Sequence, residues 1–205
     1  MPDNQIYQDY TVYLKRYNRY NVPHSGYFFC PTSTDRLICY NRIIHIERLK
    51  MGELFNIVEK YFTDEEWYFM KLDGKSILQL SYQGKNGKWS CYAQVQEEQQ
   101  LFYFYSVCPI NVPEEKRMAA AEFLTRANYG LRVGNFEMDF SDGEVRYKTS
   151  LDVENDRLSP ALISNLVYAN LWTLDRYLPG LMSVIYGGIT PQEAVDSVES
   201  PKEEE

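Results

Sequence analysis

The chain contains 205 residues, of which 44% are hydrophobic, and carries a formal net charge of −8 at pH 7. This length fits one domain with extensions, which buries roughly 70% of the surface of the unfolded chain. The acidic balance argues against a general nucleic-acid binder, because neutralising phosphates requires a basic surface.

Cysteine content and the absence of a targeting pattern favour a cytoplasmic protein. Four cysteines are too few for a disulfide scaffold, so we expect reduced thiols. The first residues form neither a basic nor an apolar targeting segment, and the longest mostly apolar run, 178–189, is interrupted by proline and glycine. We therefore expect no secretory signal and no membrane insertion.

Residues 1–48 form a tyrosine-rich extension. Within 5–20 the tyrosines recur three or four residues apart, which predicts a helix. Basic residues interleave with them, so the stripe could stack on single-stranded nucleic acid. The residues of this stripe are Tyr10, Tyr13, Lys15, Arg16, Tyr17 and Arg19. We favour the alternative, a helix that lays its tyrosines on the domain or on another subunit, because the chain as a whole is acidic.

The same extension holds both histidines and two of the cysteines. His24, Cys30, Cys39 and His45 are zinc-ligand types, and such a set would suit a tetrahedral site. They form no C-x-x-C knuckle, and the isoleucines around His45 indicate a strand. We therefore expect no metal, and a zinc-to-protein ratio near one would overturn this expectation.

A helix and four strands are predicted next. Apolar residues in 49–62 recur at helical spacing between charged residues. Strand candidates follow at 67–72, 76–82, 88–95 and 101–108, and the short links between them favour an antiparallel meander. In the third strand the predicted core face consists of Trp89, Cys91, Ala93 and Val95.

The fourth strand offers no polar face. Residues 101–105 are Leu-Phe-Tyr-Phe-Tyr, so we expect both sides of the sheet to be covered there. The cover could be the amino-terminal extension, a second subunit or a bound partner. A central strand already covered within its own chain is an equally good interpretation. Tyr92, Tyr103 and Tyr105 are the candidate partner-binding residues.

A helix and a hairpin follow the meander. Pro113 suits the first helical position, and Gly130 is predicted to take a left-handed cap at the end of that helix. The tight turn Ser141-Asp142-Gly143 then predicts a β-hairpin at the closing edge of the sheet. In the second strand of this hairpin, one face is predicted to lie in the core: Val145, Tyr147, Thr149, Leu151 and Val153.

The last long helix is predicted to start at Ser159-Pro160 and to kink or end at Pro179-Gly180. Its buried stripe contains one polar residue, Asn170, which requires a hydrogen-bond partner. A short capped helix is expected at 190–194, before an acidic, disordered tail at 196–205. The resulting order is α-β-β-β-β-α-β-β-α, which predicts an α+β fold with a twisted antiparallel sheet.

Several motifs in this order resemble the YbjN family, bacterial proteins labelled as sensory-transduction regulators, and within it the cyanobacterial and plastid branch. The resemblance covers residues 49–195 and leaves out the extension 1–48. Its motifs are Val112-Pro113-Glu114, the N-Y-G-L of 128–131, G-N-F-E-M-D of 134–139, D-G-E-V-R-Y-K-T-S-L-D of 142–152, D-R-Y-L-P-G of 175–180 and T-P-Q-E-A of 190–194.

The resemblance implies a fold similar to that of type III secretion chaperones, usually dimeric. Those chaperones bind an extended segment of another polypeptide, so the resemblance implies a protein-binding module. Fold alone does not determine function. No catalytic residues are carried over from the family.

A search for catalytic or phosphate-binding motifs agrees with this interpretation. Gly74-Lys75-Ser76 resembles the end of a phosphate-binding loop, but the required glycine is replaced by Phe69. Glu137, Asp139 and Glu144 could hold a divalent cation or act as acid and base, although a surface or hydrogen-bonded role is the simpler interpretation. We expect no cofactor and no enzymatic activity.

Two hypotheses follow. The first is a non-enzymatic, dimeric adaptor or chaperone-like module that holds a client protein segment against the face or edge of the sheet. The second is a nucleic-acid or regulatory-ligand binder that uses the basic and aromatic stripe in residues 5–20.

Overall fold

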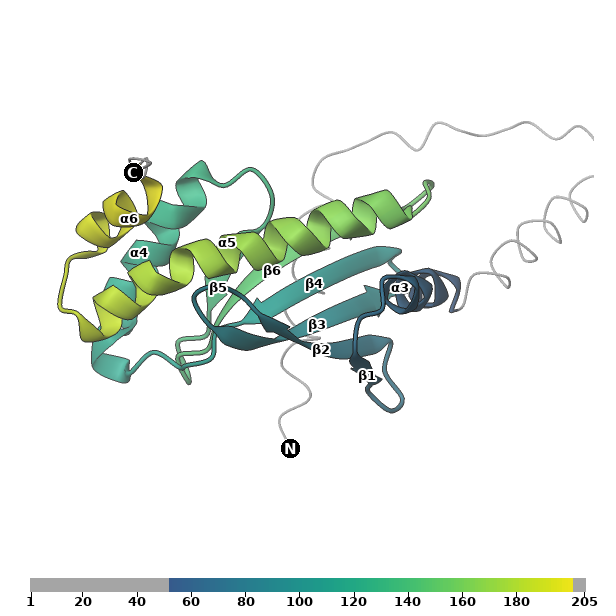
Figure 1. Ribbon diagram of the computed structural model, residues 1–205, viewed down its shortest axis with the longest axis horizontal. Helices are drawn as coiled ribbons and strands as arrows, with labels where there is room; N and C mark the ends of the chain where they lie inside the picture. The colour runs from purple at the N-terminus through teal and green to yellow at the C-terminus, as the bar shows by residue number, and fades with distance from the viewer. Residues whose placement is uncertain (1–51, 201–205) are drawn as a thin grey trace, which may run out of the picture. The chain divides into compact units, whose positions relative to one another are not determined.

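The structure is a computed structural model that describes residues 52–200 (Figure 1). An antiparallel sheet and its covering helices make up this part of the chain. Its elements are α3 (Glu53–Asp64), β1 (Phe69–Lys71), β2 (Ile77–Gln83), β3 (Lys88–Gln96), β4 (Leu101–Val107), the 3-10 turn η1 (Glu114–Lys116), α4 (Arg117–Gly130), β5 (Asn135–Met138), β6 (Val145–Asp152), α5 (Pro160–Tyr186) and α6 (Pro191–Glu199). The predicted order and the α+β class are confirmed.

The strands form one six-stranded sheet in the order β1-β2-β3-β4-β6-β5. Every neighbouring pair is antiparallel, so the predicted meander comprises β1 to β4. The predicted hairpin adds β6 beside β4 and leaves β5 at the sheet's end. Gly143 in its turn has φ +80°, and a Cβ there would lie 2.1 Å from the carbonyl oxygen of Val112. Glycine is therefore required at this turn.

Helices cover one face of the sheet. In Figure 1, α5 runs along the sheet, with α4 and α6 towards one end and α3 towards the other. The contacts agree: α5 packs on β4 and β6, α3 on β3 and α5, and α4 on β5, α5 and α6. The predicted core face of β3 is buried, and so is that of β6 except Leu151, which is half-buried. Among the residues described, no helix is long and apolar enough to cross a membrane.

The sequence predicts a kink or an end of the last helix at Pro179-Gly180, and the end is wrong, because α5 continues to Tyr186. A proline inside a helix leaves the carbonyl four residues earlier without its usual donor. Here that carbonyl belongs to Asp175, and the Asn86 side-chain amide donates to it at 2.8 Å. The next residue, Gly180, allows close packing, since a Cβ there would lie 2.8 Å from Val198 and 2.9 Å from Phe123.

Two helix-end predictions also differ from the structure. Pro113 precedes the 3-10 turn η1, and the regular helix α4 starts only at Arg117. Gly130 is the last residue of α4 and does not take a left-handed conformation, because the chain leaves the helix through the extended Leu131. Gly134, four residues later, has the positive φ instead.

The predicted short helix after Thr190 is confirmed, but the predicted start of the disordered tail is wrong. Thr190 and Glu193 form a capping box at the start of α6, as the motif T-P-Q-E-A predicts. The helix runs to Glu199, so residues 196–199 of the segment expected to be a disordered tail are helical.

Candidate functional site

The candidate site is the face of the sheet opposite α3 and α5, which we call the tyrosine face. Cross-strand pairing places Tyr92 opposite Tyr105, and Tyr105 opposite Lys148. The row continues through Gln79 on β2 to Met70 on β1 at one end, and it ends at Asn135 on β5 at the other. Because side chains alternate between the two faces of a strand, residues aligned in this way share one face.

Two of the three tyrosines stack on each other. The rings of Tyr103 and Tyr105 are 6.0 Å apart with an interplanar angle of 13°. Tyr103 is 5% exposed, and its hydroxyl donates to Oε1 of Gln96 at 3.4 Å. Tyr92 and Tyr105 are half-buried. Tyr103 is therefore the most enclosed of the three rings, whereas Tyr92 and Tyr105 are partly accessible.

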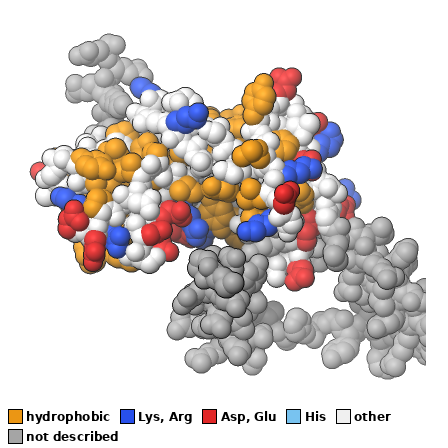
Figure 2. All heavy atoms as spheres, turned by 90° about the horizontal axis from the view of Figure 1, so that it is seen from below, with side chains coloured by type: hydrophobic (Ala, Val, Ile, Leu, Met, Phe, Trp, Pro, Cys, Tyr) orange, Lys and Arg blue, Asp and Glu red, His pale blue; other side chains and the backbone are white. Residues whose placement is uncertain are grey.

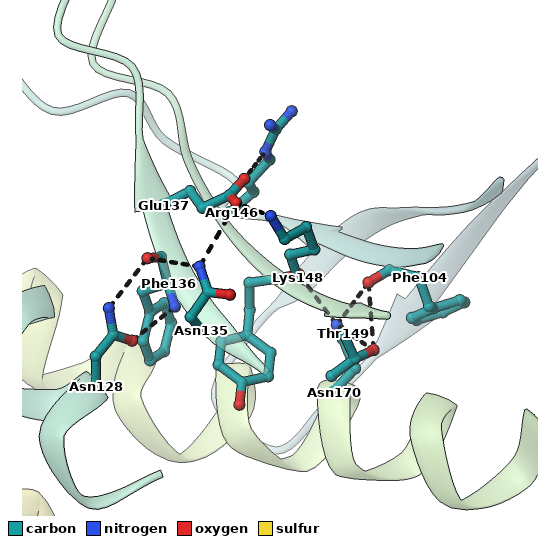
Figure 3. Close-up of polar contacts among 10 residues, drawn as sticks. Phe104, Asn128, Asn135, Phe136, Glu137, Arg146, Lys148, Thr149 and Asn170 are labelled. Carbon is teal, nitrogen blue, oxygen red and sulfur yellow. Dashed lines mark hydrogen bonds and ion pairs between the residues drawn. The ribbon is translucent and has the colours of Figure 1, made fainter. Parts of the chain in front are cut away.

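A three-residue ion network adjoins the tyrosines. Glu137 lies between Arg146, whose Nε donates to Oε2 at 2.8 Å, and Lys148, whose Nζ donates to Oε1 (Figure 3). Side-chain exposures are 42% for Arg146, 26% for Glu137 and 25% for Lys148. The guanidinium carbon of Arg146 also lies 4.8 Å from the ring centre of Tyr105, a cation–π contact.

The network fixes the charge of its carboxylate. Burial alone would raise the pKa of Glu137, but the hydrogen bond and charge of Lys148, followed by those of Arg146, outweigh it and hold this pKa below its usual value. Glu137 is thus ionised at neutral pH, and it aligns both cations beside the tyrosines. The same contact with Glu137 raises the pKa of Arg146 against the opposing effect of burial.

The opposite side of the same strands contains a buried polar cluster. Asn170 of α5 donates from Nδ2 to the carbonyl oxygens of Phe104 at 2.8 Å and Tyr147 at 3.0 Å. The same nitrogen lies 3.2 Å from Oγ1 of Thr149 (Figure 3). The prediction that Asn170 requires a partner is confirmed. These bonds tie α5 to β4 and β6, the strands that bear Tyr105 and Arg146.

The β5 edge is anchored by another asparagine. The Asn128 amide accepts from the backbone nitrogen of Phe136 at 2.7 Å and donates to its carbonyl oxygen at 3.1 Å. A neighbouring strand would make the same pair of bonds. Asn128 therefore blocks strand addition at this point of the edge and holds β5, with Glu137, against the end of α4.

The predicted acidic cluster does not converge on one point. Glu137 binds Arg146 and Lys148, and Asp139 accepts from the backbone nitrogen of Ser141 at 2.7 Å. Among the described residues there is no group of three or more His, Cys, Asp and Glu side chains arranged to hold a metal. Burial raises the pKa values of the Cys91 and Cys108 thiols to about 12, which keeps both protonated.

The remaining predicted residues lie outside the described part of the chain. They are the nucleic-acid stripe, Tyr10, Tyr13, Lys15, Arg16, Tyr17 and Arg19, and the possible zinc ligands, His24, Cys30, Cys39 and His45. Both sets stay predictions. The sequence analysis did not predict that Glu137, Arg146 and Lys148 form one ion network. The register of the hairpin, which pairs Glu137 with Arg146, would have predicted their contact.

Figure 2 shows the molecule from below, with hydrophobic side chains, a class that includes tyrosine, lying among acidic and basic ones. The surface on this side is therefore mixed in character.

No curated protein matches the sequence. One similar solved structure is described as "Crystal structure of YbjN, a putative transcription regulator from E. coli", with 12% identity and a TM-score of 0.47 over 65% of this chain and 89% of that chain. Another is "Structure of the HopA1-SchA Chaperone-Effector Complex", with 14% identity and a TM-score of 0.39 over 62% of this chain and 94% of that chain.

A family model also matches residues 55–183; it is described as "YbjN: Putative bacterial sensory transduction regulator". The match lies entirely within the described α+β domain and spans more than half of the chain, so the protein belongs to the YbjN family.

Proposed function

We propose that the protein is a non-enzymatic, protein-binding module of a cytoplasmic regulator, and that the tyrosine face holds an extended segment of a partner protein. The observation that carries this proposal is the cross-strand row of Tyr92, Tyr105 and Lys148, with Arg146 stacked on Tyr105. The family's description as a regulator of sensory transduction supports a binding role.

The row suits a polypeptide partner for two reasons. Tyrosine rings offer a large contact area and lose little rotamer entropy on binding. Arg146, 42% exposed, keeps part of its guanidinium accessible while Glu137 fixes its position. A partner segment could thus bury apolar side chains on the rings and place a carboxylate or carbonyl oxygen near Arg146.

We further propose that the protein works as a homodimer, since most soluble oligomers are symmetric dimers of one chain. Light scattering on the purified protein measures the mass directly. A mass of one chain at working concentrations would exclude this part of the proposal and leave the binding face unaffected.

The proposed function is tested by capturing partners from the source cell and then measuring binding with the purified partner. Replacing Tyr92 or Tyr105 by alanine should weaken binding about tenfold or more, as expected for a central aromatic contact. Tyr129→Ala is the matched control, because Tyr129 is 96% exposed on α4.

Unchanged affinity in both face variants would contradict the proposal. Salt-dependent retention of RNA or single-stranded DNA that disappears on deleting residues 1–22 would favour the second hypothesis instead.

A further inference from the structure

The turn between β2 and β3 is hydrogen-bonded to α5. The two carboxylate oxygens of Asp175 accept from backbone nitrogens of this turn, that of Lys85 at 3.1 Å and that of Asn86 at 2.8 Å. In the opposite direction, the Asn86 side-chain amide donates to the carbonyl oxygen of Asp175 at 2.8 Å. This amide replaces the backbone donor that Pro179 lacks, so one side chain supports the passage of α5 through its proline.

The same asparagine precedes Gly87, and the pair has a chemistry of its own. Asn86 is the only asparagine in the chain that is followed by glycine. Because glycine has no side chain to shield its backbone nitrogen, that nitrogen can attack the amide carbon of the preceding asparagine. Asn86 is exposed, and within residues 52–200 the backbone nitrogen of Gly87 has no hydrogen-bond acceptor. The attacking nitrogen is therefore available.

We propose that Asn86 is a site of spontaneous deamidation and that the reaction releases the β2–β3 turn from α5. The Gly87 nitrogen forms a bond to Cγ of Asn86, the bond from Cγ to Nδ2 breaks, and ammonia leaves. Water then opens the resulting succinimide ring and yields aspartate or isoaspartate at this position. Water is the only co-reactant, and no oxidant or reductant takes part.

The product cannot make the contacts of the amide. A carboxylate is acceptor-only at neutral pH, so the carbonyl oxygen of Asp175 loses its donor. The new negative charge also lies beside the Asp175 carboxylate, and their repulsion destabilises the bound turn. Arg176 lines the same pocket as Asn86, but its guanidinium already donates to the carbonyl oxygen of Val198.

Isoaspartate disturbs the turn in a second way, because it adds a carbon atom to the backbone. The turn fits closely against α5: a Cβ on Gly87 would lie 2.8 Å from Cδ2 of Leu178. A lengthened backbone would have to move away from this side chain. Both products therefore favour the released turn.

Peptide mass spectrometry on the full-length protein, stored at mildly alkaline pH, measures the reaction. Asn86 should convert at least about tenfold faster than Asn111. Asn111 is the matched internal control, because it is also exposed and its amide also donates to a backbone carbonyl oxygen, that of Asp142 at 3.2 Å. The residue after it is Val112, whose branched side chain shields the attacking nitrogen.

Thermal melts test whether conversion releases the turn. Asn86→Asp, which reproduces one product, should lower the melting temperature by about 4 °C or more, whereas Asn165→Asp should shift it by less than about 1 °C. Asn165 is an exposed position on α5, so this control adds the same charge away from the turn. Stored wild-type protein should drift towards the melting temperature of Asn86→Asp, and stored Asn86→Ala should not drift.

A second variant identifies the source of the loss. Pro179→Ala restores a backbone donor to the carbonyl oxygen of Asp175, so the amide of Asn86 is no longer needed there. The fall in melting temperature caused by Asn86→Ala should therefore be roughly halved in the Pro179→Ala background.

Three results would overturn the inference. They are equal conversion at Asn86 and Asn111, an Asn86→Asp protein that melts like wild type, and a loss in Asn86→Ala that Pro179→Ala leaves unchanged. None of these measurements involves a partner protein or the tyrosine face, so their failure is distinct from failure of the proposed function.

Discussion

The two faces of the sheet use the same strands for different purposes. On the helix side, Phe102, Phe104 and Tyr147 are fully or almost fully buried, and Asn170 satisfies backbone groups among them. On the tyrosine face, half-buried rings lie beside a charged network with substantial exposure. The side chains whose burial stabilises the fold therefore lie mainly on one face, and folding constrains the composition of the other face less strongly.

The largest effect is expected for Phe104→Ala on the helix side. Phe104 is fully buried and its ring lies 6.2 Å from that of Phe62. The free energy of unfolding should fall by about 3–5 kcal/mol, which urea denaturation measures. Phe140→Ala, at a site 53% exposed, should have little effect. Equal losses in both variants would break the distinction between the faces.

Asn170→Leu should have the next largest effect. It leaves the carbonyl oxygens of Phe104 and Tyr147 without this donor, although it also removes the buried Oδ1, which has no partner among residues 52–200. A net loss of about 1–3 kcal/mol in unfolding free energy follows. The control is Asn165→Leu, an exposed position on α5. A stabilised Asn170→Leu protein would show that the cluster is not needed for stability.

Glu137→Gln tests the charged network on the tyrosine face and is expected to cost about 1 kcal/mol at neutral pH. The folded pKa of Glu137 is lowered, so its stabilisation is complete above the unfolded pKa of about 4.3 and is lost as pH falls through the folded value.

The stability gap between wild type and Glu137→Gln should therefore close below about pH 4, as thermal melts across pH measure. Glu122→Gln, which breaks an exposed pair with Arg126, is the control and should show almost no gap. A gap that persists in acid would mean that the carboxylate charge is not its source.

The smallest effect on stability is expected for Tyr92→Ala. This ring is half-buried on the tyrosine face, so the loss should be at most about 1 kcal/mol in the same urea assay. The change should affect partner binding far more than folding. A loss comparable to that of Phe104→Ala would place Tyr92 in the structural core.

Local patterns predicted most of the fold. Alternation in residues 88–95 identified the buried face of β3, and the Asp142-Gly143 turn located the hairpin. The passage of α5 through Pro179 could not be predicted, because the compensating donor is Asn86, on a turn far away in sequence. Single-sequence patterns do not identify such a long-range partner.

The candidate site also contains one part that local sequence patterns predict and one part that they do not. The tyrosines of β3 and β4 were identified from sequence because their strands alternate or lack a polar face. The ion network of Glu137, Arg146 and Lys148 was not predicted, because these side chains come together only when β5 pairs with β6 in the folded hairpin.

The pairing of Asn128 with Phe136 also bears on aggregation. A strand from another molecule that paired with β5 would first have to displace the Asn128 side chain, which already binds the backbone nitrogen and the carbonyl oxygen of Phe136. An open strand edge favours pairing with another chain, so these two bonds make the β5 edge less receptive at Phe136.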